Sequence, residues 1–212
     1  MKTADLIQAL AVNSAAPQAR TAPAIAVSAA VGAAVTFVVL VLWMGLQPIG
    51  PMVAAGWFWM KMAYTWALAL AGLAIVARMA SPGRGPGLAA PLGVIACVAV
   101  MATLAAMEIL HAAPAAVPSL FVGMHAQACS LRILALSAPV YAVVVVVLRR
   151  FAPTRLTAAG AAAGLLAGAV AASVYNLGCM ETTATFVLIW FTLGIAVCAG
   201  LGALIGPRLL RW

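Results

Sequence analysis

The chain has 212 residues, of which 67% are hydrophobic and only 7% are charged, and its formal net charge is +8. Soluble domains are about one quarter charged, so this composition excludes a soluble globular protein. The positive charge is explained by membrane topology, because basic loops are retained on the cytoplasmic side, and we therefore expect no direct contact with nucleic acid.

Residues 1–23 form a predicted cytoplasmic segment ahead of the first apolar run. Leu6, Ile7 and Leu10 share one face of a short amphipathic helix, with Asp5 in its first turn. Two interpretations stay open for this helix. It lies on the lipid surface, or it docks onto a soluble partner.

Six apolar runs follow, each near the length of about 20 residues that crosses a hydrocarbon core. In lipid each run has to be helical, because every backbone polar group must be satisfied within the segment. The first run starts too far along the chain, and is too long, for a cleaved signal peptide. The sequence therefore predicts an all-α membrane helix bundle over 24–206, with spans at 25–46, 57–77, 88–110, 131–148, 157–175 and 184–205.

The basic residues indicate the orientation of this bundle in the membrane. All except Lys61 and Arg132 fall in the termini or in alternate connections, which predicts that both termini, including a basic tail at 207–212, are cytoplasmic. Lys61 and Arg132 lie near the outer ends of their spans, where long side chains are expected to snorkel to the interface. The cytoplasmic set consists of Lys2, Arg20, Arg78, Arg84, Arg149, Arg150, Arg155, Arg208 and Arg211.

The predicted outer face carries most of the reactive chemistry. Cys129 and Cys179 fall at one depth on this side of the membrane. Three interpretations stay open: a disulfide, a thiol pair that binds a soft metal, or two unrelated buried thiols. Location on the oxidising side of a membrane favours redox or metal chemistry.

Further soft or imidazole groups lie near the two cysteines in the sequence. We expect His111, His125, Met124 and Met180 to be auxiliary ligands if a thiophilic ion such as copper or cadmium binds there as a signal. The competing interpretation is that the histidines are solvated and the methionines pack. No obligatory cofactor is expected.

Glycines recur at four-residue spacing in the last two spans, at Gly160, Gly164 and Gly168 and again at Gly202 and Gly206. Small faces of this kind let helices approach closely. The contact forms either within one bundle or between protomers, so a homo-oligomer is left open.

Other function classes have less support in the sequence. The middle of each span lacks ionisable residues, which disfavours ion-coupled transport and leaves a small channel or permease for a neutral solute or a soft metal as the alternative. A membrane thiol oxidoreductase normally needs a CxxC motif, which is missing. No phosphate loop, zinc motif or Ser-His-Asp pattern is present, so an enzyme is not expected.

Several short motifs resemble the negative regulator of sigma F family, the six-span membrane anti-sigma factors of bacteria. They are MKTADLIQAL at 1–10, FWMK at 58–61 with Tyr64 and Thr65, Cys129 with Leu136 and Pro139, APTR at 152–155, WFTLG at 190–194 and GPRLLRW at 206–212. Their order and spacing span the chain from end to end.

The resemblance implies a regulator in the bacterial inner membrane that sequesters an extracytoplasmic-function sigma factor. It also implies that Cys129 and Cys179 match the family's cysteine pair, which is tied to the response to heavy metals or oxidants. The chain departs from the family where a histidine often precedes the second cysteine, because Gly178 occupies that position.

Overall fold

The computed structural model describes residues 21–46, 49–81, 85–123 and 126–211. All regular elements in these ranges are helices, and six of them are long and apolar enough to cross a membrane. The prediction of an all-α bundle with six spans is confirmed. The candidate partner-binding residues Asp5, Leu6, Ile7 and Leu10, and the candidate ligands Met124 and His125, lie outside the described residues.

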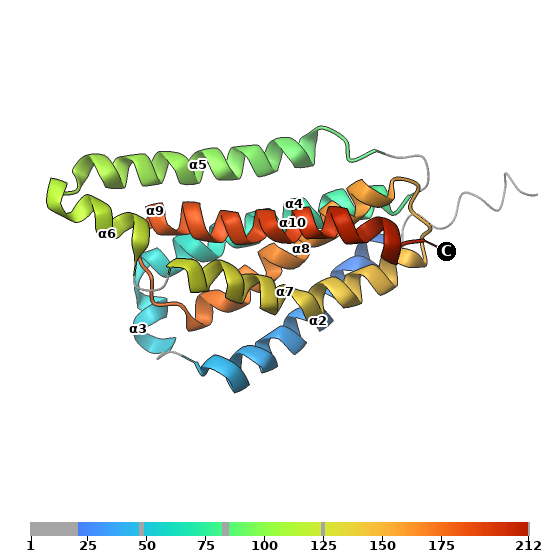
Figure 1. Ribbon diagram of the computed structural model, residues 1–212, viewed down its shortest axis with the longest axis horizontal. Coiled ribbons are helices and arrows are strands. Elements are labelled where there is room, and N and C mark those ends of the chain that lie inside the picture. Colours follow the sequence, from blue (N-terminus) through green and yellow to red (C-terminus); the bar gives the residue numbers. More distant parts are fainter. Residues whose placement is uncertain (1–20, 47–48, 82–84, 124–125, 212) are drawn as a thin grey trace, which may run out of the picture.

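The long helices agree with the predicted spans to within a few residues (Figure 1). The sixth span is continuous through three labelled pieces, because η4 is a widened turn inside it. The spans are α2 (Thr21–Met44), α4 (Gly56–Met79), α5 (Ala89–His111), α7 (Ala126–Arg149), α8 (Leu156–Tyr175) and α9 (Ala184–Phe186) with η4 (Val187–Phe191) and α10 (Thr192–Leu209).

Short helices also occupy the connections at one end of the bundle, where the sequence predicted only loops. They are α3 (Ile49–Ala54), η2 (Pro114–Ala116), α6 (Val117–Val122) and η3 (Asn176–Gly178). Proline at the start of η2 and of α6 suits a first helical turn, where its missing N–H is not needed. These segments are too short to show a helical period in the sequence.

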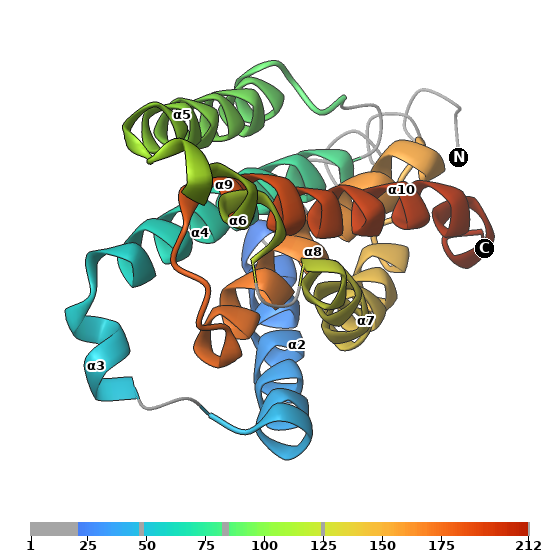
Figure 2. The same cartoon turned by 60° about the vertical axis from the view of Figure 1, so that its left-hand side comes forward.

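Helix α8 forms the centre of the bundle and packs against α2, α4, α7 and α10. Its small residues, mostly alanine and glycine, are buried along nearly its whole length. By contrast, α5 lies to one side, where it packs on α4 and on the start of the sixth span (Figure 2). Near its end, the Glu108 carboxylate accepts hydrogen bonds from the Thr185 N–H (2.8 Å) and hydroxyl (2.7 Å), which joins α5 to α9.

The glycine faces of α8 and α10 pack against each other within this bundle. A Cβ added at Gly160 would overlap the Gly202 carbonyl oxygen, and one added at Gly164 would overlap the Cys198 carbonyl oxygen. The backbones of the two helices therefore touch, as in other small-residue interfaces of membrane helices.

Both described ends of the chain lie at the same end of the bundle, as an even number of spans requires (Figure 1). The predicted tail at 207–212 begins inside the last turn of α10, which continues through Pro207 to Leu209. Leu210 is buried, and the Arg149 guanidinium donates a hydrogen bond to the Arg211 carbonyl at 3.3 Å. The start of this tail is thus packed onto the bundle.

Candidate functional site

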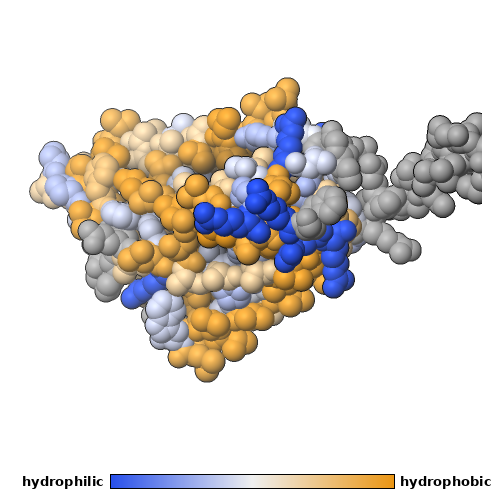
Figure 3. All heavy atoms as spheres, turned by 45° about the vertical axis from the view of Figure 1, so that its right-hand side comes forward, coloured by the Kyte–Doolittle hydropathy of each residue, from blue (hydrophilic) through white to orange (hydrophobic). Residues whose placement is uncertain are grey.

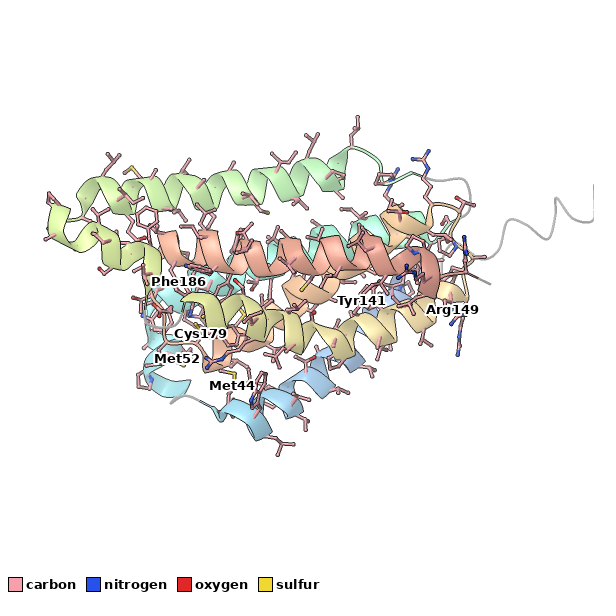
Figure 4. The ribbon with its side chains drawn as sticks, viewed as in Figure 1. Met44, Met52, Tyr141, Arg149, Cys179 and Phe186 are labelled. Atoms are coloured by element: carbon pink, nitrogen blue, oxygen red, sulfur yellow. The ribbon has the colours of Figure 1, made fainter. Side chains whose placement is uncertain are left out.

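Cys179 lies at the other end of the bundle, far from Arg149 along the helix axes (Figure 4), and Cys129 is in hydrogen-bond contact with it. Cys129 lies in the first turns of α7, and Cys179 begins the non-helical segment 179–183 that follows η3. The Cys129 thiol donates a hydrogen bond to the Cys179 sulfur, and both residues are free cysteines. Their side chains are 1% and 4% exposed.

Tyr175, at the end of α8, fixes the Cys129 side of this pair. Its hydroxyl lies 3.1 Å from the Cys129 sulfur, and its ring packs on Phe191 with centroids 5.9 Å apart. The partly buried Arg132, one turn further along α7, is also hydrogen-bonded to the Tyr175 hydroxyl. Arg132 therefore has a partner inside the protein in addition to its access to the interface.

Lys61 lies directly against the Cys179 segment, and its predicted snorkelling is wrong. The side chain is 0% exposed, and its ammonium donates a 2.9 Å hydrogen bond to the Cys179 carbonyl oxygen. The same ammonium lies 4.6 Å from the centroid of the Trp57 ring, one helical turn earlier in α4. The carbonyl and the aromatic face provide favourable partners inside the protein, so the charge does not turn to the interface.

Three neighbours stabilise a negative charge on Cys179. The hydrogen bond from Cys129, the charge of Lys61 and the backbone N–H of Glu181 together lower the pKa of the Cys179 thiol to about 6, although burial opposes them. A thiolate, and not a thiol, is the nucleophile and the metal ligand in cysteine chemistry. Cys179 is therefore the more reactive sulfur, and Cys129 is the thiol that lies beside it.

Alkylation of Cys179 should report this low pKa directly. With a pKa of about 6, roughly ten thiolates are present for each thiol at pH 7. The rate of reaction with iodoacetamide, followed by mass spectrometry, is expected to rise from about pH 5 to 7 and then level off. In the unfolded chain the rate should keep rising to about pH 8.5, the pKa of a free cysteine. A midpoint near 8.5 in the folded protein would contradict the assigned electrostatics.

A widened turn of the sixth span borders the thiol pair. The Ser130 hydroxyl donates to the Trp190 carbonyl at 2.7 Å, and the Trp190 indole donates to the Phe121 carbonyl at 2.8 Å. Both bonds involve Trp190 of η4, which is a π-helical turn. Turns of this kind often occur at functional sites. The two hydrogen bonds of Trp190 join α6, α7 and the sixth span next to Cys129.

The remaining predicted ligands are not gathered around the cysteines in the described part of the chain. His111 is exposed, and its ring Nδ1 lies 2.7 Å from the Met107 carbonyl of its own helix. Met180 follows Cys179 directly and is half exposed. Within the described ranges, no three His, Cys, Asp or Glu residues lie close enough to hold a metal ion. The two cysteine sulfurs are a donor set suited to a thiophilic ion.

Sequence reasoning missed Lys61 and Tyr175 as members of this site. One signal for Lys61 was available, because Trp57 and Lys61 are four residues apart and share a helix face, the spacing at which a cation can reach an aromatic ring. Nothing comparable pointed to Tyr175, since its contact with Cys129 joins residues 46 positions apart.

Comparison with known proteins agrees with the resemblance found in the motifs. The family described as "Negative regulator of sigma F" matches residues 10–212. The chain belongs to this family. Its members are regulatory proteins and not enzymes, so the regulatory class expected from the motifs is confirmed.

Two relatives of the same family match the chain over its full length. The "Probable anti-sigma-F factor NrsF" of Azospira oryzae is 39% identical over 216 residues, and the match covers 100% of both chains. The "Anti-sigma-F factor NrsF" of Caulobacter vibrioides is 34% identical over 225 residues, again with 100% of both chains covered. No solved structure matches.

Proposed function

We propose that this chain is a bacterial inner-membrane anti-sigma factor that binds an extracytoplasmic-function sigma factor and releases it when Cys129 and Cys179 react with an oxidant or a heavy metal. The anti-sigma-F names of its full-length relatives support the regulatory part. The buried thiol pair, with its activated Cys179, supports the sensing part.

Charge supports an orientation with the arginine-rich end in the cytoplasm. We call the exposed residues at this end, namely Arg78, Arg149, Arg150, Arg155, Arg208 and Arg211, the arginine end. Figure 3 shows hydrophilic residues gathered at this end, with apolar surface beside them. The acidic residues of the described ranges, Glu108 and Glu181, both lie at the opposite end, which would then face the periplasm.

The arginine end suits an acidic protein surface as its partner. Its guanidinium groups have no carboxylate neighbour at that end within the described residues, so their charge is available to steer and orient a partner. The predicted helix at 1–13 would add the apolar contacts, through Leu6, Ile7 and Leu10. In this arrangement the sigma factor is held by a combined basic and apolar surface.

The oxidant signal follows ordinary thiol chemistry, with a hydroperoxide as the oxidant. The Cys179 thiolate attacks one peroxide oxygen, an S–O bond forms, the O–O bond breaks and hydroxide or alkoxide leaves. The Cys129 sulfur then attacks the Cys179 sulfur, and the sulfenic oxygen leaves as water with the Cys129 proton. The two cysteines lose two electrons, which the peroxide gains. A divalent thiophilic metal would instead bind both sulfurs and displace the Cys129 proton.

Two helices offer a route from the thiol pair to the arginine end. Helix α7 has Cys129 near its start and Arg149 at its end, and α8 starts after Arg155 and leads to the Cys179 segment. A bridge between the cysteines would change how these two helices pack against each other. A tenfold loss of sigma affinity requires only about 1.4 kcal/mol of difference between the two states.

Co-purification in detergent tests the proposal. The full-length chain is expected to retain its candidate sigma factor, whereas a chain without residues 1–13 is expected to lose it by at least about tenfold in affinity. Retention by the truncated chain would transfer the binding site to the arginine end alone. If the intact chain binds no sigma factor, the proposal is wrong, and solute uptake by vesicles that contain only this protein would then test the channel or permease alternative.

A further inference from the structure

Lys61 is a buried cation whose partners come largely from the segment that carries Cys179. Its ammonium is held by the Cys179 carbonyl at 2.9 Å and by the Trp57 ring. The anionic or titratable groups that act on it are Cys179, Cys129 and Glu181, of which Glu181 is partly exposed to solvent. A fully buried lysine is stable only while such partners remain in place.

A bridge between the two cysteines changes these partners. An S–S bond is about 2.05 Å long, well inside hydrogen-bond contact, so at least one of the two cysteines has to move when it forms. Cys129 is fixed in α7 by burial and by Tyr175, whereas Cys179 belongs to the segment 179–183, which lies outside the helices. Cys179 is therefore the residue that moves, and its carbonyl moves with it.

We propose that Lys61 transmits the signal from the thiol pair to α4: a bridge between Cys129 and Cys179 draws the Cys179 carbonyl away from the Lys61 ammonium, and the ammonium, without this hydrogen bond, leaves its buried position and moves the outer part of α4. This inference rests on the proposed sensing function and names how it is transmitted. Lys61 acts as a positioning residue, because it reacts with neither oxidant nor metal.

Both proposed signals act on the same contact. A disulfide joins the two sulfurs directly, and a metal ion bound to both sulfurs also holds them in a new arrangement. Either event therefore displaces the Cys179 carbonyl that accepts the Lys61 hydrogen bond at 2.9 Å.

Helix α4 is well placed to carry this movement through the bundle. It packs along α8 and contacts both α2 and α5. Thr65, one turn after Lys61, donates to the Lys61 carbonyl at 3.0 Å and accepts from the buried Asn176 amide at 3.4 Å. The Asn176 oxygen has no hydrogen-bond partner within the described residues. The contact between the Asn176 amide and Thr65 joins α4 to η3, the turn that leads into Cys179.

Amine labelling measures the exposure of Lys61 independently of sigma binding. The chain has only two lysines, Lys2 and Lys61, so a water-soluble acylating reagent gives sites that mass spectrometry assigns without ambiguity. The full-length protein in detergent is labelled before and after treatment with hydrogen peroxide or cadmium ions, and each sample is normalised to a denatured aliquot. Labelling of Lys61 is expected to rise at least about tenfold with either treatment.

Two variants complete this test. In Cys129→Ser, peroxide forms no bridge and Lys61 labelling is expected to stay low, so a rise there would overturn the proposal. In Lys61→Met, the bridge still forms, but the sigma factor is expected to stay bound, because an apolar side chain of similar length has no charge to leave unpaired. The proposal is also wrong if Lys61→Met releases the sigma factor on oxidation as the parent does. It is equally wrong if Lys61→Met releases the sigma factor when no oxidant is added.

The outcomes separate this inference from the proposed function. If Lys61 stays unlabelled after complete loss of free Cys129 and Cys179 thiols, the role of Lys61 is wrong, whatever the sigma factor does. If labelling rises while the sigma factor stays bound to the parent, the movement of Lys61 is supported and the proposed release of sigma is wrong.

Discussion

A Cys129→Ser, Cys179→Ser double variant is expected to keep its sigma factor bound while it loses release by hydrogen peroxide and by cadmium ions. Serine hydroxyls form no disulfide and are poor ligands for soft metals. The substitution removes the reactive sulfurs at two buried positions with little change in side-chain size. The measurement is the fraction of sigma factor that elutes from the immobilised complex after each treatment, where the parent should release most of its partner.

Cys198→Ser is the matched control for this double variant. Cys198 is also buried, but it hydrogen-bonds Ser137 at 3.3 Å, on a different part of α7 from Cys129. The control should release the sigma factor as the parent does. Normal release from the double variant would show that the signal does not pass through Cys129 and Cys179, and loss of release from Cys198→Ser would show that the response depends on packing and not on the thiol pair.

The six spans were predictable because a single physical requirement determines them. Lipid leaves the backbone no hydrogen-bond partner outside its own helix, so the length of each apolar run is enough to give its structure. The described helices begin and end within a few residues of the predicted limits. The short helices α3 and α6 were not predictable in this way, because they lie in the connections, where that requirement does not apply.

The site was predictable only in part. The position of Cys129 and Cys179 on one side of the membrane follows from the span assignment, but the partners of their side chains do not. Lys61 meets Cys179 across 118 positions of the chain, and its burial depends on that contact. From the sequence alone, a lysine near a span end is expected to reach the interface, because an ammonium group has a lower free energy in water than in a buried site without a known partner.

Gly164→Val is expected to destabilise the bundle by about 3 kcal/mol or more, because α8 and α10 touch through their backbones at this position. An added Cβ would overlap the Cys198 carbonyl oxygen and lie 3.0 Å from the Ala199 Cα. Both are backbone atoms in a helix, so neither rotates away as a flexible side chain does, and the helices have to separate. Overpacking a core costs about 1–3 kcal/mol, and more when the backbone must shift. Such a loss is a large share of the total stability of about 5–15 kcal/mol.

Gly200→Val provides the comparison within the same pair of helices. Gly200 lies in α10, one helical turn or less from the Gly164 contact, but its added Cβ meets nothing within 4 Å. This variant should therefore fold in detergent with nearly the stability of the parent, measured as the fraction folded during thermal unfolding. Equal stability of the two variants would mean that α8 and α10 are not in backbone contact. Because α8 also packs on α4 and α7, separation of α8 from α10 would disturb the helices that surround the thiol pair, so sigma binding by Gly164→Val should fall in step with its folded fraction.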